Sequence, residues 1–175
     1  MQNNKFDVII LAGGKGTRIK KFLKNKPKPM IKIQNLNFLD ILIKNFSKYS
    51  INKIYIAAGF KGDKIFKKFH NKKVNLVDIK CIIEKKTLGT GGSLSQFNGK
   101  TTKKFFVING DTFFDIDLNK IFYKYKNSKK IYLALSNSNN YKTNVKLTNL
   151  SIKNKKLVIY DKKSKYFNGG IYFFF

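Results

Sequence analysis

FDVIILAGGKGTR, at residues 6–18, joins an apolar run to a glycine-rich loop. The run from Phe6 to Ala12 has the composition of a buried parallel strand, and Gly13, Gly14 and Gly16 follow it at once. A strand that delivers a flexible loop in this way is typical of a phosphate-binding region. The segment therefore predicts a sheet whose ligands lie at the carboxyl ends of its strands.

The loop matches neither of two common nucleotide-binding fingerprints. A Walker loop needs four residues between its first glycine and a Gly-Lys-Ser/Thr, and the dinucleotide fingerprint needs a third glycine that is missing here. Three glycines still let backbone N–H groups approach an anion closely, and Arg18 adds a planar, permanently charged fork where a triphosphate would lie. The alternative, a tight turn with a solvated arginine, stays open at this point.

Helical and strand patterns alternate after this loop. Apolar spacing predicts a helix over residues 39–46 and a short helix around 65–69, and Asp117 is expected to cap a third helix. Strands are predicted at 53–58, 79–83 and 104–108. This alternation is typical of an α/β domain with a largely parallel central sheet. Past residue 130 the pattern changes to short strands, predicted at 131–135, 145–147, 157–160 and 171–175.

The charge is strongly basic, with 37 Lys and Arg against 9 Asp and Glu, a net +28. The lysines are spread over almost every segment rather than gathered in a stripe, so nucleic acid is not the expected partner, although a basic RNA-binding protein remains an alternative. No run approaches the roughly 20 uncharged apolar residues of a membrane span. We therefore expect no membrane partner and a cytoplasmic location. Cys81, the single cysteine, is expected to be buried.

Two further motifs supply candidate ligand-binding groups. In PKPM, Pro27 and Pro29 are expected to hold the backbone extended on both sides of Lys28, which suits a phosphate clamp, although most lysines simply solvate. In EKKTLGTGG, at residues 84–92, the glycines and Thr90 are expected to line a flat base. The Glu84 carboxylate is an acceptor suited to the two adjacent donors on guanine's Watson–Crick edge.

Two more segments place polar side chains beside glycines. VINGD ends in Asp111, a carboxylate at the end of a predicted strand beside the phosphate loop. Mg²⁺ takes one or two protein carboxylates together with phosphate oxygens, so Asp111 is a candidate metal ligand. The amide of Asn168, before Gly169 and Gly170, suits hydrogen bonds to sugar hydroxyls, but the same tripeptide is equally an ordinary turn.

The chain resembles the sugar-1-phosphate nucleotidylyltransferases, most of all the heptose 1-phosphate and mannose-1-phosphate guanylyltransferases, through LAGGKGTR, PKPM, EKKTLGTGG, NGDTFFDIDL and NGGIY in this order. The resemblance implies one Rossmann-like (GT-A type) domain over residues 1–175. Residues 1–130 would be its nucleotide-binding part and residues 131–175 the start of its sugar-binding part. The family's second acidic metal ligand would lie past residue 175, so the domain is expected to lack its C-terminal elements.

The resemblance also implies roles for individual residues. It places Leu11, Ala12, Gly13, Gly14, Gly89 and Thr90 around the nucleotide. It makes Arg18, Lys28 and Asp111 catalytic, with Arg18 at the triphosphate, Lys28 on phosphate and Mg²⁺ on Asp111. Asp161 and Asn168 would lie at the sugar.

The implied reaction joins a nucleoside triphosphate to a sugar 1-phosphate and releases pyrophosphate, which would supply a nucleotide-sugar for surface polysaccharide. From the resemblance we predict that Glu84 selects guanine and so favours GTP, because the related uridylyl- and thymidylyltransferases have glutamine at the corresponding spacing. Such transfer depends on positioning and charge neutralisation, so no Ser, His or Cys nucleophile is needed. A catalytically incompetent nucleotide-binding fragment is the alternative, and a homo-oligomer is left open.

Overall fold

The structure is a computed structural model, which describes residues 5–175 except 24, 87–88, 138–148, 154–155 and 160–165. Side chains are not described at 18, 20, 149, 151–153 and 156–159. The strands are β1 (Phe6–Leu11), β2 (Lys32–Ile33), β3 (Leu36–Asn37), β4 (Ile51–Ala58), β5 (Lys73–Val74), β6 (Val77–Ile83), β7 (Phe105–Asn109), β8 (Tyr132–Asn137), β9 (Asn149–Lys153), β10 (Lys156–Ile159) and β11 (Tyr166–Phe174). The helices are α1 (Lys20–Leu23), α2 (Phe38–Phe46), α3 (Gly62–Phe69), α4 (Gly89–Ser95) and α5 (Leu118–Tyr125), with 3₁₀ turns η1 (Thr17–Ile19) and η2 (Lys28–Met30).

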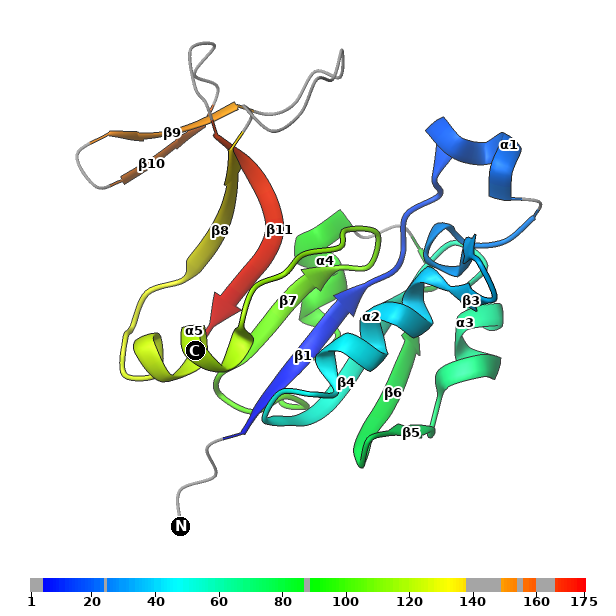
Figure 1. Ribbon diagram of the computed structural model, residues 1–175, viewed down its shortest axis with the longest axis horizontal. Helices are drawn as coiled ribbons and strands as arrows, with labels where there is room; N and C mark the ends of the chain where they lie inside the picture. Colours follow the sequence, from blue (N-terminus) through cyan, green and yellow to red (C-terminus); the bar gives the residue numbers. More distant parts are fainter. Residues whose placement is uncertain (1–4, 24, 87–88, 138–148, 154–155, 160–165) are drawn as a thin grey trace.

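Four parallel strands form the centre of the main sheet, in the order β7-β1-β4-β6 (Figure 1). Antiparallel strands extend it on both sides: β5 beyond β6, and β11 beyond β7, with β8 and β9 paired to β11 and β10 to β9. Because the central strands are parallel, their carboxyl ends meet at one edge of the sheet. The predicted α/β fold with a mostly parallel centre is confirmed.

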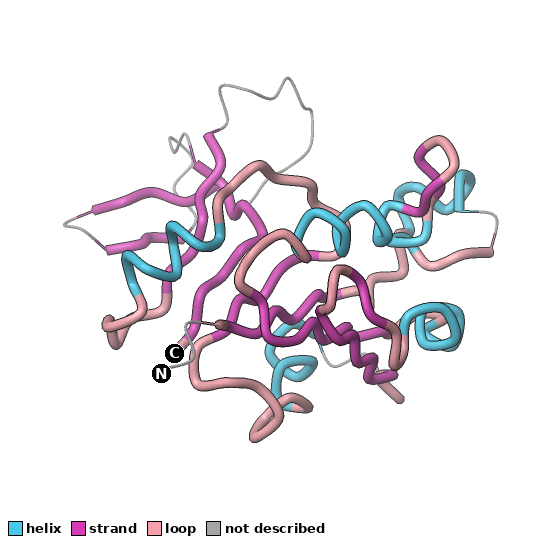
Figure 2. The backbone as a smooth tube through the Cα atoms, turned by 60° about the horizontal axis from the view of Figure 1, so that its bottom comes forward, coloured by secondary structure: helices cyan, strands magenta, loops and turns pink. Residues whose placement is uncertain are grey.

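The sheet lies between helices on both faces (Figures 1 and 2). Phe6, Val8 and Ile10 of β1 belong to the core formed with α2, α3 and α5. Ile9 belongs to a second core on the other face, with Phe97 and with Leu94 of α4 packed against it. This alternation along one strand explains why β1 is apolar apart from Asp7: both of its faces are buried.

Most elements predicted from periodicity are present within a few residues of their expected bounds. α2 and β1 match closely, and Asp117 caps α5 by accepting a hydrogen bond from the Lys120 N–H at 3.1 Å. Cys81 is buried, as expected. Strand β9 was not predicted, and the strand expected at 145–147 lies outside the described residues.

Asn168, Gly169 and Gly170 lie inside β11 rather than in a turn, which corrects one of the two interpretations left open. The pairing of β11 with β8 shifts register between Asn168 and Tyr172, so these glycines form an irregularity within the strand. No helix of the described residues is long and apolar enough to cross a membrane.

Candidate functional site

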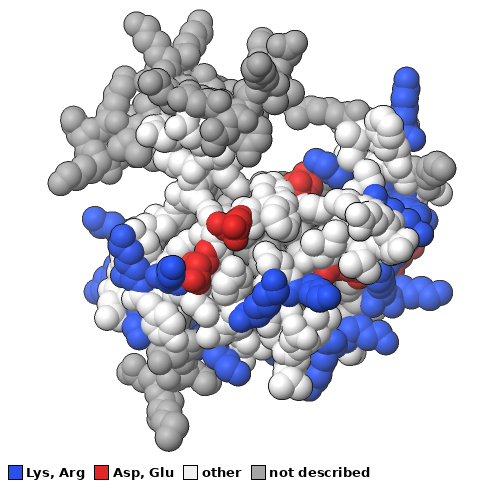
Figure 3. Space-filling view, viewed as in Figure 1, with Lys and Arg blue, Asp and Glu red and all other residues white. Residues whose placement is uncertain are grey.

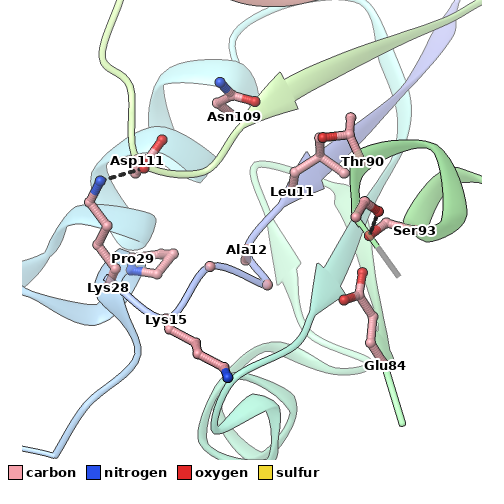
Figure 4. A pocket seen from close by; sticks show the side chains of 13 residues that line it. Leu11, Ala12, Lys15, Lys28, Pro29, Glu84, Thr90, Ser93, Asn109 and Asp111 are labelled. Atoms are coloured by element: carbon pink, nitrogen blue, oxygen red, sulfur yellow. Dashed lines mark hydrogen bonds and ion pairs between the residues drawn. The ribbon is translucent and has the colours of Figure 1, made fainter. Parts of the chain in front are cut away.

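A cavity of about 490 Å³ opens at the carboxyl edge of the parallel strands (Figure 4). Its volume is in the range of small-molecule and cofactor sites. The loops after β1, β6 and β7, the η2 turn and α4 all contribute to its wall. The lining residues are Leu11, Ala12, Gly13, Gly14, Lys15, Lys28, Pro29, Glu84, Gly89, Thr90, Ser93, Asn109 and Asp111.

Backbone hydrogen bonds fix the loop after β1 to the end of β4 and to the loop that follows it. The Ala12 N–H donates to the Ala57 carbonyl at 2.8 Å, and the Phe60 N–H donates to the Gly13 carbonyl at 3.1 Å. These bonds hold the glycine-rich segment at the edge of the sheet. Its backbone is thereby placed before any ligand arrives, which lowers the ordering cost of binding.

The ends of β6 and β7 are tied to the same edge. The Glu84 N–H donates to the Ala58 carbonyl, and the Gly110 N–H donates to the Leu11 carbonyl, both at 2.8 Å. A Cβ on Gly110 would lie 2.7 Å from the Leu11 carbonyl oxygen, so only glycine fits this crossing. Glu84 and Asp111 are consequently presented into one cavity by two strands on either side of β1.

Lys28 and Asp111 form an ion pair at one side of the cavity (Figure 4). The Lys28 Nζ lies 2.5 Å from Asp111 Oδ2. Pro27 is extended, as predicted, but Lys28, Pro29 and Met30 form a 3₁₀ turn. The expected extension after Lys28 is therefore wrong, because the fixed φ of Pro29 is also compatible with a turn.

Glu84 lies on the other side of the loop after β1 (Figure 4). Its Oε1 atom is buried and has no hydrogen-bond partner. No cation of the described residues forms a salt bridge with this carboxylate. An unsatisfied buried acceptor costs about 1–3 kcal/mol, more if charged, so a ligand that supplies donors here gains an unusually favourable contact.

Gly89, Thr90 and Ser93 reach the cavity from the short helix α4. From Gly89 onward the EKKTLGTGG segment is helical. The Ser93 hydroxyl donates to the Gly89 carbonyl at 2.8 Å, inside the helix. Gly89 has a positive φ of 67°, which marks the entry into the helix.

The cavity contains few side chains that could bind the expected Mg²⁺. Among the described residues there is no group of three or more His, Cys, Asp or Glu side chains that would hold a metal. Asp111 is one carboxylate, and Mg²⁺ commonly binds through one or two carboxylates with phosphate oxygens and water completing its shell. The residues present therefore fit a Mg²⁺ that arrives with a phosphorylated ligand.

Asn168 is not among the residues that line the cavity. Asn168 is exposed, and its amide is engaged locally: it donates to the Tyr172 hydroxyl at 2.5 Å and accepts from the Gly170 N–H at 2.8 Å. Arg18 lies in η1, but its side chain is not described, and Asp161 lies outside the described residues.

Four lining residues were not among the predicted site residues: Lys15, Pro29, Ser93 and Asn109. Lys15, Pro29 and Asn109 stand inside motifs that the sequence singles out, so motif membership was the available signal for them. Asn109 also packs against the β11 irregularity, since a Cβ on Gly170 would lie 2.7 Å from its Nδ2. It connects the cavity to the segment that carries Asn168.

The lysines visible on one face of the molecule are not gathered in a single stripe. On the face shown in Figure 3 they lie on both sides and along the lower edge, with acidic side chains among them. A nucleic-acid footprint is normally a localised basic patch.

A glycine-rich loop, a lysine–aspartate pair and an unpaired carboxylate at the carboxyl edge of a parallel sheet define an α/β domain suited to a phosphorylated ligand with a polar base. The chain belongs to the nucleotidyl transferase family, whose model matches residues 7–144. The resemblance noted in the sequence is confirmed.

Individual relatives agree with this assignment. The chain is 38% identical over 168 residues to the D-glycero-alpha-D-manno-heptose 1-phosphate guanylyltransferase of Campylobacter jejuni, covering 94% of this chain and 73% of that one. The structure of HddC from Yersinia pseudotuberculosis complexed with GMP-PN matches with a TM-score of 0.77 and 29% identity, over 97% of this chain and 76% of that one. The inositol-1-phosphate CTP transferase of T. maritima shares the fold, with a TM-score of 0.76 at 18% identity over 99% and 72% of the two chains.

Proposed function

We propose that this chain transfers a guanylyl group from GTP to a sugar 1-phosphate and releases pyrophosphate. The observation that carries the proposal is the arrangement of two unlike groups on opposite sides of the loop after β1 (Figure 4). Glu84 presents an unpaired carboxylate on one side, and Lys28 with Asp111 forms a charged pair on the other. The similarity to a heptose 1-phosphate guanylyltransferase supports both the nucleotide and the sugar phosphate.

Glu84 is the base-selecting group. Guanine carries two adjacent donors, the N1–H and the 2-amino group, and an ionised carboxylate is an acceptor-only group with two oxygens. Uracil offers a single ring N–H, and adenine and cytosine have an acceptor nitrogen at the corresponding ring position. Only guanine supplies a pair of donors to Glu84, whose buried Oε1 otherwise has no partner.

Lys28 and Asp111 form the phosphate end. Lys28 would bind the phosphates as a point charge, with Arg18 at the triphosphate as the sequence indicates. Asp111 would hold Mg²⁺, which supplies charge neutralisation to the phosphate oxygens when bound. The backbone of Gly13 and Gly14 would lie against the nucleotide, because the absence of side chains there permits close approach.

The reaction that follows is an in-line displacement. A phosphate oxygen of the sugar 1-phosphate forms a bond to the α-phosphorus of GTP, while the bond from that phosphorus to the bridging oxygen of the β-phosphate breaks. Pyrophosphate leaves with the bridging oxygen, and the product is a GDP-sugar. Catalysis of this type depends on positioning and on charge stabilisation, which the cavity side chains would provide.

The acceptor sugar would lie toward β11. We assign residues 1–130 to nucleotide binding and 131–175 to the start of the sugar-binding part, with Asn168 and Asp161 at the sugar. Asn109 connects the two parts, because it lines the cavity and packs against Gly170.

A nucleotide competition tests the proposal. The chain is incubated with Mg²⁺, a sugar 1-phosphate and equal concentrations of GTP, UTP, CTP and dTTP, with mannose 1-phosphate and heptose 1-phosphate in parallel, and products are identified by mass. The expected product is predominantly the GDP-sugar, and Asp111→Asn should abolish it. A predominant UDP- or dTDP-sugar would contradict the assignment of Glu84.

A further inference from the structure

Gly59, the first residue after β4, is a glycine that backbone conformation does not require. The glycines with positive φ are Gly16, Gly89, Gly99 and Gly170, and Gly59 is not one of them. An alanine at position 59 would therefore meet no φ penalty. The reason for glycine at this position must be the space around it.

That space is closed by the loop after β1 and by Glu84. A Cβ at position 59 would lie 2.6 Å from the Gly13 Cα and 2.8 Å from the Gly13 carbonyl oxygen, and 3.1 Å from Glu84 Oε2. The first two are backbone atoms, which cannot rotate away as the end of a side chain can. The reverse contact is also tight, since a Cβ on Gly13 would lie 2.9 Å from Glu84 Oε2. The carboxylate thus rests against two facing glycines.

Hydrogen bonds prevent the segments that carry Gly13 and Gly59 from moving apart freely. The Phe60 N–H donates to the Gly13 carbonyl, and the Glu84 N–H donates to the Ala58 carbonyl, so residues on both sides of Gly59 are tied to the two segments that it touches. A side chain at position 59 would have to separate Gly13 from Gly59 or push the Glu84 carboxylate outward. Either movement shifts the Glu84 carboxylate oxygens relative to the base, and hydrogen bonds weaken steeply when their distance or angle changes.

We infer that Gly59 is a specificity-determining positioning residue, which fixes the Glu84 carboxylate at the depth where it meets guanine. This inference rests on the proposed function, because it needs Glu84 to bind the base. Gly59 touches no substrate and acts only through Gly13 and Glu84. Its substitution should change which purine is bound and should leave binding of the triphosphate intact.

The test compares the affinities of GTP and inosine triphosphate, which lacks only the 2-amino group of guanine. Titration calorimetry is performed on the 175-residue chain and on Gly59→Ala, with Gly62→Ala as the matched control. Gly62 is the first residue of α3, and the atoms nearest to a Cβ there belong to the side chains of Ala58 and Ile83, at 3.1 and 3.3 Å. Thermal unfolding of each variant reports the cost to the fold.

The unsubstituted chain and Gly62→Ala should prefer GTP over inosine triphosphate by about 10- to 100-fold, the range for a hydrogen bond to a charged group. Gly59→Ala should bind the two about equally, with its affinity for GTP lowered more than its affinity for inosine triphosphate, because GTP loses two contacts to Glu84 and inosine triphosphate loses only the N1–H contact. If Gly59→Ala does not fold, Gly13→Ala tests the same contact through the flexible end of Glu84 and should also lose the preference. A preserved preference in the alanine variants overturns the inference alone, whereas no preference in the unsubstituted chain overturns the proposed base selection and the inference with it.

Discussion

Lys28 Nζ lies 2.5 Å from Asp111 Oδ2, although 83 residues separate the two in the sequence. The η2 turn presents Lys28 and the end of β7 presents Asp111, and both line the same cavity. A phosphate clamp and a metal ligand proposed from separate motifs are thus neighbours. When substrate binds, we expect Lys28 to contact phosphate and Asp111 to bind Mg²⁺, so that these two contacts replace the ion pair.

Replacing Lys28 separates its role in turnover from its role in stability. Lys28→Met should lower kcat/KM for pyrophosphate release by about 10²- to 10³-fold, the usual cost of losing a group that stabilises transition-state charge. The free energy of unfolding should change by less than about 1 kcal/mol, because side-chain exposures of 35% and 39% leave the pair screened by solvent. Lys68→Met is the control, since Lys68 makes a similar 2.5 Å pair with Asp40 outside the cavity. Equal losses of turnover in both variants would contradict the assignment.

Glu84→Gln should erode the preference for GTP over UTP. The substituted amide presents one donor toward a guanine edge that has only donors there, so one contact becomes unfavourable and the preference should fall by about 10- to 100-fold. Competition turnover with the two nucleotides measures the ratio. Asp78→Asn, at the other end of β6, is the matched control and should keep it. An unchanged ratio in Glu84→Gln would remove Glu84 from base selection.

Gly110→Ala should lower turnover through Asp111 and should leave base selection by Glu84 unchanged. The new Cβ would lie 2.7 Å from the Leu11 carbonyl oxygen, so the end of β7 and the adjacent Asp111 must shift. A displacement of about 1 Å can cost 10²-fold in rate, and pyrophosphate release should fall accordingly. The ratio of GTP to inosine triphosphate affinity should stay that of the unsubstituted chain. Loss of this ratio would show that the two ends are not independent.

The parts of the fold that depend on local pattern were predictable from the sequence. β1 is apolar except for Asp7 and is followed closely by glycines, and α2 repeats its apolar residues at helical spacing, so both were located within a residue or two. Asp117 was identified as a cap because an acidic residue preceded an amphipathic segment. The candidate residues Glu84, Lys28 and Asp111 stood in short motifs, and the structure brings all three to one cavity.

The parts that depend on tertiary contacts were not predictable. α4 consists of Gly, Thr, Ser and one Leu, residues that mostly disfavour helix, and it is packed through Leu94 against the second core. β11 continues through two glycines that a local interpretation assigns to a turn. Gly59 had no signal at all, because its need for glycine comes from a contact with Gly13 in another loop.

Asp7 is expected to serve stability alone. Its buried carboxylate accepts from the Thr102 N–H at 2.6 Å and from the Asn52 amide at 2.9 Å. Asp7 lies at the amino end of β1, and the cavity lies at the carboxyl end. Asp7→Asn turns one acceptor into a donor that faces another donor, which should lower the free energy of unfolding by about 1–3 kcal/mol in urea titrations. Nucleotide preference should not change. A selective loss of GTP binding would show coupling between the two ends of β1.

Cys81 should make stability fall in alkaline solution. Burial raises the pKa of the Cys81 thiol from 9.0 to about 12. Above pH 9 the unfolded chain therefore releases a proton that the folded chain retains, and this part of the stability is lost as pH rises toward 12. Urea titrations from pH 8 to 10 should show a steeper decline in the unsubstituted chain than in Cys81→Ala. Equal slopes in the two chains would contradict the raised pKa and indicate an accessible thiol. Rapid iodoacetamide labelling of the native chain at pH 8 would independently show that the thiol is accessible.

The rate of pyrophosphate release by the 175-residue chain with Mg²⁺ and GTP tests guanylyl transfer most directly. It is measured with and without a sugar 1-phosphate, heptose 1-phosphate and mannose 1-phosphate being compared, and with Asp111→Asn in parallel. The account predicts release that requires both the sugar phosphate and Asp111. No release above that of Asp111→Asn, with GTP still raising the melting temperature, would contradict guanylyl transfer by this chain and leave it a nucleotide-binding domain.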